Sequence, residues 1–262
     1  MPIGQCKLCL KTKVIRRSHL VPRALYEMSR DTRAKKPDPV LMTRRVAVRT
    51  NRQIEDYVLC GDCEQRFNKN GEDWILRHVD NGKHFPLLQT LKLAIPFRAT
   101  QRIVAFSGAA VGIDTEKLAY FALSVLWRSS VHEWRILGQT TSVSLGVHEE
   151  PVRKYLLGED AFPSDVHVLV VACTDLASRG SFYVPGVLRH GLTMMYVLLT
   201  RGIYFRVHAG GRISPQMREL CCLCSPHKPI FMRDCEDKTT DACGPLFSTA
   251  RITEDLLATY QF

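Results

Sequence analysis

Two short cysteine pairs are the residues whose spacing most clearly predicts chemistry. Cys6 and Cys9 form one Cys-x-x-Cys pair near the amino terminus, and Cys60 and Cys63 form a second. Two residues between cysteines allow both thiolates to bind one face of a metal ion. Two such pairs complete a tetrahedral all-sulfur site with no position left for water. The sequence therefore predicts a structural Zn²⁺ ion held by these four cysteines.

A third pair, Cys221 and Cys224, makes this spacing more frequent than chance allows. Ten cysteines placed at random in a chain of 262 residues would give about 0.4 such pairs, and this chain has three. His227 follows at the same interval, so a second metal site is a hypothesis, with Cys235 or Cys243 as the fourth ligand. The alternative is that these cysteines are small buried hydrophobic residues.

A histidine and a polar segment accompany the two pairs predicted to bind zinc. His19 lies between the pairs, and a run of polar residues follows Cys63 directly. In that run Glu64, Asn68 and Glu72 offer oxygen atoms, which are the ligands that Mg²⁺ and Mn²⁺ prefer. A neutral imidazole can take a proton from water while a divalent cation stabilises negative charge on a phosphate. These residues together predict phosphodiester hydrolysis, with the imidazole as general base.

The elements that must hold these residues follow from local patterns. Residues 12–15 favour an extended strand, and Pro22 disfavours a helix just before it, so His19 is expected at a strand end or in a turn. A short helix is expected after Pro22. A second helix is expected directly after the second cysteine pair, and Asn81-Gly82 would stop it.

In these residues the chain resembles the HNH endonucleases, also called the His-Me finger or ββα-metal family, in the subgroup whose core is clamped by two zinc knuckles. The resemblance rests on the two cysteine pairs and on the segment Ser18-His19-Leu20-Val21-Pro22, and it covers residues 1–80. It implies a ββα-metal module with His19 as the base that activates water. It also implies that the helix after the second pair holds a catalytic Mg²⁺ or Mn²⁺ ion.

The chain departs from the pattern of this family at several positions. Ser18 stands where the family often has aspartate, and Glu64 stands where it usually has histidine. Asn68 falls where some branches carry aspartate, and Glu55 lies near the place of the central asparagine. Glutamate can still ligate magnesium, so Glu64, Asn68 and Glu72 are the predicted ion ligands. The alternative for each of them is a solvated helix face, and for the histidine it is packing.

The composition is that of a globular chain with an excess of positive charge. Its 36 Lys and Arg outnumber 26 Asp and Glu, which gives a net charge of +10. Nucleic acid is the commonest partner for such an imbalance, and we expect DNA rather than RNA. Residues 30–53 carry much of the charge and are expected to form either a solvated loop or a phosphate-contacting arm. The sequence has no apolar signal region and no apolar run of membrane-spanning length, so a cytoplasmic location without membrane contact is expected.

Beyond the predicted module of residues 1–82, residues 83–262 are expected to form a larger α+β region. The helices predicted from apolar periodicity and capping residues are 115–126, 149–157 and 254–260, and the strands predicted from apolar runs and turns are 166–172, 194–199 and 203–207. The pair Trp127-Arg128 is expected to serve packing, with base stacking as the alternative. We expect this region to recognise substrate, to regulate, or to mediate self-association into a homo-oligomer.

The favoured function is metal-dependent cleavage or nicking of DNA by an HNH-type endonuclease, reminiscent of bacterial antiphage or mobile-element proteins. A first alternative is a non-catalytic zinc module that binds nucleic acid, for which the four-thiolate scaffold is sufficient. A second alternative is a sensor whose cysteines in residues 221–243 respond to metal or to oxidation.

Overall fold

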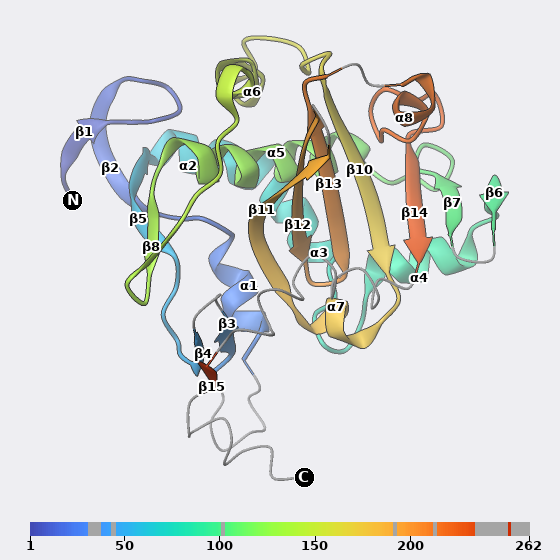
Figure 1. Cartoon of the computed structure of the whole chain (residues 1–262), viewed down its shortest axis with the longest axis horizontal. Coiled ribbons are helices and arrows are strands. Elements are labelled where there is room, and N and C mark those ends of the chain that lie inside the picture. Colours follow the sequence, from blue (N-terminus) through green and yellow to red (C-terminus); the bar gives the residue numbers. More distant parts are fainter. Residues whose placement is uncertain are drawn as a thin grey trace.

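The fold is a mixed α+β arrangement, as the sequence predicts. The computed structural model describes residues 1–30, 38–42, 46–100, 103–190, 193–211, 214–233 and 251–252 (Figure 1). The cysteine-bearing amino-terminal strands lie on one side of the molecule in this view, and a large sheet lies on the other. None of the described helices combines the length and the apolar character that crossing a bilayer requires.

The amino-terminal sheet places the predicted base at the end of a strand. It pairs β1 (Ile3–Gln5), β2 (Thr12–His19) and β5 (Glu55–Cys60) in an antiparallel arrangement with β2 in the middle. Strand β2 is longer than the predicted segment because backbone pairing with β5 continues from Ile15 to His19. The predicted position of the histidine at a strand end is confirmed. The short helix α1 (Arg23–Met28) follows it, also as predicted.

The predicted helix after the second cysteine pair is present, but it is not a continuous α-helix. It consists of α2 (Gly61–Phe67), a π-helical turn (Asn68–Glu72) and α3 (Asp73–His78). Gly71 lies in the π turn, where a Cβ atom would come within 3.0 Å of the backbone of Phe121. The absence of a side chain there lets this segment approach the longest helix closely.

That longest helix, α5 (Thr115–Val131), is the centre of the fold. The side chain of Asp114 accepts a hydrogen bond from the backbone N–H of Lys117 at 3.0 Å, which confirms the predicted cap. The helix is buried on nearly all sides, which is the pattern of a core helix rather than a surface one. One continuous core cluster surrounds it and contains Phe67 from the amino-terminal half and Phe205 from the other. The boundary at residue 82 stays a prediction.

The large sheet has seven strands within the described residues, in the order β11-β12-β13-β10-β14-β7-β6. Their bounds are β6 (Arg98–Ala99), β7 (Val104–Ser107), β10 (Val166–Cys173), β11 (Phe182–His190), β12 (Thr193–Thr200), β13 (Ile203–Ala209) and β14 (Pro229–Arg233). The predicted strand and hairpin are therefore confirmed as β10, β12 and β13. Alternate β10 residues such as Val168 and Val170 belong to the core cluster around α5, while Leu169 and Val171 point to the opposite face.

The remaining elements are short and surround this framework. The helices are α4 (Pro86–Leu93), the 3-10 turn Gly146–His148, α6 (Glu149–Leu157), α7 (Leu176–Gly180) and α8 (Pro215–Glu219). The strands are β3 (Val40–Met42), β4 (Val46–Arg49), β8 (Trp134–Ile136), β9 (Gln139–Thr141) and β15 (Arg251–Ile252). Helix α6 ends as predicted, because Gly158 adopts a left-handed conformation at φ 73°. The predicted helix 254–260 and part of the basic segment 30–53 lie outside the described residues.

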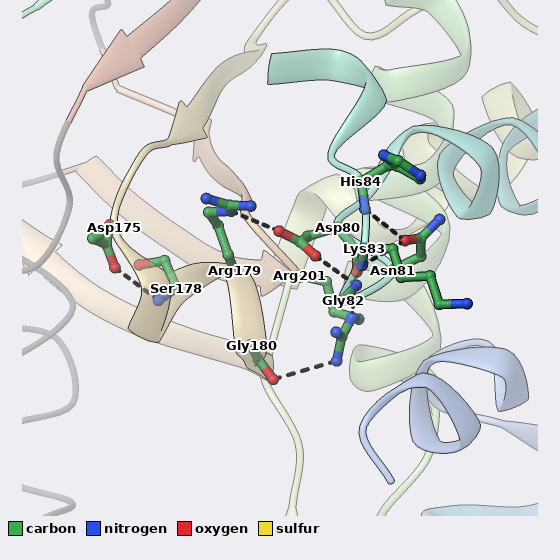
Figure 2. A network of polar contacts seen from close by, with 10 residues as sticks. All are labelled: Asp80, Asn81, Gly82, Lys83, His84, Asp175, Ser178, Arg179, Gly180 and Arg201. Atoms are coloured by element: carbon green, nitrogen blue, oxygen red, sulfur yellow. Dashed lines mark hydrogen bonds and ion pairs between the residues drawn. The ribbon is translucent and has the colours of Figure 1, made fainter. Parts of the chain in front are cut away.

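A polar network fastens the end of α3 to the large sheet (Figure 2). The buried carboxylate of Asp80 accepts a hydrogen bond from Arg179 Nε at 2.6 Å, and the backbone carbonyl of Asp80 accepts one from Arg201. Arg201 also donates to Ser29 Oγ, at the end of α1, at 3.2 Å. These contacts join the segment after α3 and the end of α1 to α7 and to the turn between β12 and β13.

Candidate metal centre and its histidine

The four predicted zinc ligands come together although Cys9 and Cys60 are 51 positions apart in the sequence. The sulfur atoms of Cys6, Cys9, Cys60 and Cys63 all lie within 4.8 Å of one another, and those of Cys9 and Cys60 are 3.9 Å apart. Zn–S bonds of about 2.3 Å in a tetrahedron place sulfurs about 3.8 Å apart. The cluster could therefore hold a tetrahedral ion after a contraction of about an ångström or less, and its all-thiolate donor set is consistent with structural zinc.

Two different elements present the cysteine pairs. The first pair lies in the tight connection between β1 and β2, where the N–H of Leu10 donates to the carbonyl of Cys6 at 2.9 Å. The second pair opens α2, with Cys60 as the residue before its first turn. The positive end of a helix dipole favours thiolates at this position. In addition, Arg153 of α6 donates to the carbonyl of Leu8 at 2.7 Å, so the later part of the chain supports the first loop.

The surroundings favour a charged sulfur in the cluster. Hydrogen bonding from the Cys63 thiol, helped by backbone N–H groups, lowers the pKa of Cys6 to about 4. The backbone N–H of Cys60 lies 3.3 Å from the sulfur of Cys6 and donates to it. A thiolate is the form that binds metal, so the electrostatics agree with the geometry.

His19 lies beside a carboxylate that was not among the predicted site residues. Its Nε2 atom is 3.3 Å from Oε2 of Glu55, the residue directly opposite it in the β2–β5 pair. Glu55 also forms an ion pair with Arg17 at 3.0 Å. Burial lowers the pKa of His19, and a hydrogen bond with Gln53 and the charge of Glu55 oppose that effect only in part. The imidazole is thus neutral near pH 7, and 19% of its side-chain surface is exposed.

Glu64 is the predicted ion ligand that stays closest to this strand end. Its carboxylate forms a hydrogen bond with Ser18, the neighbour of His19, and lies near the charge of Arg128. Burial raises the pKa of Glu64, against the opposing effects of Arg128 and Ser18. Its Oε1 atom is buried and has no hydrogen-bond partner. An unpaired buried carboxylate oxygen requires an explanation, and a bound cation would supply one.

The other two predicted ligands do not add a free oxygen to this arrangement, although Glu72 lies near enough for its charge to raise the pKa of Glu64. Glu72 is only 6% exposed and forms an ion pair with Arg128 at 2.6 Å, so its charge is already compensated. Asn68 is exposed at the start of the π turn. Outside the four cysteines, no group of three or more His, Cys, Asp or Glu side chains within the described residues lies close enough to share a metal ion.

Arg128 is the residue at this site whose role the sequence did not reveal. It reaches from α5 to donate to the backbone carbonyl of His19 at 2.8 Å and to Glu72 at 2.6 Å. Its guanidinium lies 5.2 Å from the ring centroid of Phe67. The expectation that Trp127 and Arg128 serve packing is confirmed, because both side chains are almost fully buried. The arginine also fixes the end of β2, which carries the histidine.

The second concentration of cysteines does not form a metal cluster among the residues that the structure describes. Cys221 is buried and Cys224 is exposed. The ring of His227 stacks on Phe97 with centroids 4.8 Å apart. The two remaining predicted ligands, Cys235 and Cys243, lie outside the described residues, so the second metal site stays a hypothesis.

Comparison of the chain with family models, with curated proteins and with solved structures found no match.

Proposed function

We propose that this protein is an HNH-type, metal-dependent endonuclease that cleaves or nicks DNA. The observation that carries the proposal is the pairing of His19 with Glu55 at 3.3 Å, at the end of a strand whose other end leads into the four-cysteine cluster. A half-buried histidine that is neutral near pH 7 and has a carboxylate beside it is suited to act as a general base. Strands β2 and β5 pair antiparallel and α2 follows β5 directly, which supports the proposed ββα-metal arrangement, with α1, β3 and β4 inserted between the two strands.

Each residue of the site has a distinct task in this mechanism. Neutral His19 accepts a proton from the attacking water, and the Glu55 carboxylate stabilises the imidazolium that forms. Arg128 holds the backbone at His19 in place through its hydrogen bond to the carbonyl. The four cysteines, with a structural ion bound, fix β2 against α2. This keeps His19 and the polar helix in a constant relative position.

Glu64 is the residue that would hold the catalytic divalent cation. Magnesium in enzymes is commonly bound by one or two carboxylates together with water and substrate phosphate, and the unpaired Oε1 of Glu64 suits that role. When bound, such a cation supplies positive charge that stabilises the phosphate oxygens during cleavage. Glu72 does not fit as a second ligand because it is neutralised by Arg128, and Asn68 lies exposed on the adjoining turn.

The second function to weigh is a non-catalytic zinc module that binds nucleic acid. The pairing of Glu72 with Arg128 favours this binding function. It leaves Glu64 as the one predicted carboxylate ligand, whereas an HNH endonuclease is expected to offer the ion several oxygen ligands. The excess positive charge of the chain serves either function. The nuclease and the non-catalytic binding module predict different results with a circular DNA substrate.

The wild-type protein is expected to convert supercoiled plasmid to the nicked or linear form in Mg²⁺ or Mn²⁺. His19→Ala should lower the rate by about 100-fold or more, because a general base contributes about 10²–10⁴-fold. His148→Ala is the matched control, since this histidine also pairs with a carboxylate, Asp165, at 2.8 Å but lies in the 3-10 turn before α6 rather than at the end of β2. Gel electrophoresis of plasmid over time measures each rate. Retardation of the plasmid by both proteins without any nicking would favour the binding module and reject the nuclease.

The cleavage rate is expected to rise with pH and to reach half its maximum below pH 6.5. The sign follows from burial, which lowers the pKa of His19 and so keeps the base deprotonated at more acidic pH than an exposed histidine. In Glu55→Gln the acidic limb should move to still lower pH, because the negative charge that raises this pKa is lost. Rates measured from pH 5 to 8 at constant metal concentration check both shifts. An acidic limb that is the same in both proteins would contradict the assigned base.

A further inference from the structure

The face of the large sheet that points away from α5 contains an apolar cavity. One row of side chains crosses five strands on this face, because backbone pairing places Tyr204, Val171, Phe231, Ala105 and Arg98 opposite one another in turn. All five line a cavity of about 280 Å³. The strands that carry them, from β13 to β6, lie side by side on the right of Figure 1. The cavity is separate from the cysteine cluster and from His19.

The floor of this cavity is apolar. Leu169 and Val171 of β10 contribute aliphatic side chains, and Phe231 of β14 contributes an aromatic ring. Val171 and Tyr204 also belong to a second apolar cluster that is distinct from the main core. Concave apolar surfaces with a few polar groups are typical of small-molecule sites. The hydrocarbon floor therefore favours the apolar body of a ligand rather than a sugar or a base with many polar edges.

Positive charge borders the cavity. Arg98, Arg206 and Arg233 all line it, and none of the described lining residues is acidic. The guanidinium of Arg206 lies 5.5 Å from the ring centroid of Tyr204, which holds it over the floor. Its Nε atom is buried and has no hydrogen-bond partner. A buried donor without a partner is costly, and an anionic ligand group would satisfy it.

We propose that this cavity binds a small amphipathic anion, namely a carboxylate with a hydrocarbon body. The arginines select the negative charge, because hydrogen bonds from guanidinium to carboxylate are strong and directional. The volume selects the size, since a cavity of about 150 Å³ accommodates benzene and this one is about twice as large. A body of roughly ten carbon atoms fits that estimate. The site is independent of the proposed nuclease activity.

Decanoate is the probe for this site, and isothermal titration calorimetry of the full chain with its metal measures the affinity. Decanoate is expected to bind, and 1-decanol, which has the same body without the charge, is expected to bind at least tenfold more weakly. Arg206→Met should weaken decanoate binding by about tenfold or more, because a hydrogen bond to a charged group is lost. Arg135→Met removes the same charge from an exposed position on β8 and should leave the affinity unchanged.

A second variant tests the cavity rather than the charge. Ala105 lies in the floor, so Ala105→Trp should fill the space and abolish decanoate binding. A melting curve and the zinc content test whether this variant is folded. If it is unfolded, the Arg206→Met variant and the comparison with 1-decanol still test the proposal. Three results would overturn the proposal: equal affinity for decanoate and 1-decanol, unchanged decanoate binding by a folded Ala105→Trp variant, or no detectable binding of decanoate at about 1 mM. At that concentration only complexes with a Kd well above about 1 mM escape detection.

Discussion

Cys63→Ser is expected to lose the bound zinc ion and to destabilise the amino-terminal half of the protein. Cys63 is buried in the first turn of α2, and its sulfur lies within 4.8 Å of the other three. Loss of a structural metal belongs to the few changes that cost more than about 4 kcal/mol. In a chain of this size about 4 kcal/mol corresponds to a fall in melting temperature of about 10 °C.

The metal content and the melting temperature together check this result. Elemental analysis of the intact wild-type protein should give one zinc per chain more than the variant. Cys224→Ser is the matched control, because Cys224 is exposed and belongs to no metal cluster within the described residues. It should retain the zinc and melt within about 2 °C of the wild type, as exposed substitutions usually cost less than about 0.5 kcal/mol. A wild-type protein isolated intact without metal would refute the zinc site.

The four-cysteine cluster could be predicted from sequence because its information is local. Each Cys-x-x-Cys pair specifies its own half of the site, and the chemistry of thiolates specifies the ion. The prediction of the four-cysteine site did not require knowledge of the long-range pairing between β2 and β5. For the same reason the cap at Asp114 and the stop at Gly158 were predictable, since each depends on residues within one turn of the helix end.

The three predicted ion ligands do not form one exposed row, for a reason that residue types do not signal. In an uninterrupted α-helix, Glu64, Asn68 and Glu72 follow one another at intervals of four and share one face. The π turn from Asn68 to Glu72 has more residues per turn, so the face rotates. Glu72 is then directed inward to Arg128, while Asn68 stays exposed. The π turn accompanies the close approach of Gly71 to α5, which is a tertiary contact.

The contacts that Glu55 and Arg128 make with residues from other elements could not be predicted from the sequence. Glu55 was noted only for its place in the sequence, and its pairing with His19 depends on the register between β2 and β5. Arg128 is 109 residues from His19 and 56 from Glu72, and it meets both only because α5 crosses the amino-terminal elements. Hydrophobic periodicity predicted that helix correctly, but it carries no information on which strand end the arginine reaches.

Arg128→Met is expected to destabilise the protein by about 3–5 kcal/mol, because it leaves Glu72 buried without a compensating charge. Both side chains are almost fully removed from solvent, at 1% exposure for Arg128 and 6% for Glu72. The methionine fills much of the space of the arginine stem, so the loss reports on charge more than on packing. Urea denaturation followed by circular dichroism measures the change. Lys228→Met, which removes the surface pair with Glu116 at 3.4 Å, is the control and should cost about 0–1 kcal/mol.

The double variant Arg128→Met/Glu72→Gln separates the ion pair from the other contacts of the arginine. A neutral amide removes the buried charge, so the double variant should be more stable than Arg128→Met alone by about 2 kcal/mol or more. It should still be less stable than the wild type, because the carbonyl of His19 has lost its donor. If Glu72→Gln recovers nothing in the Arg128→Met background, the pair is not the main contribution of Arg128, and its role is confined to holding the strand that carries His19.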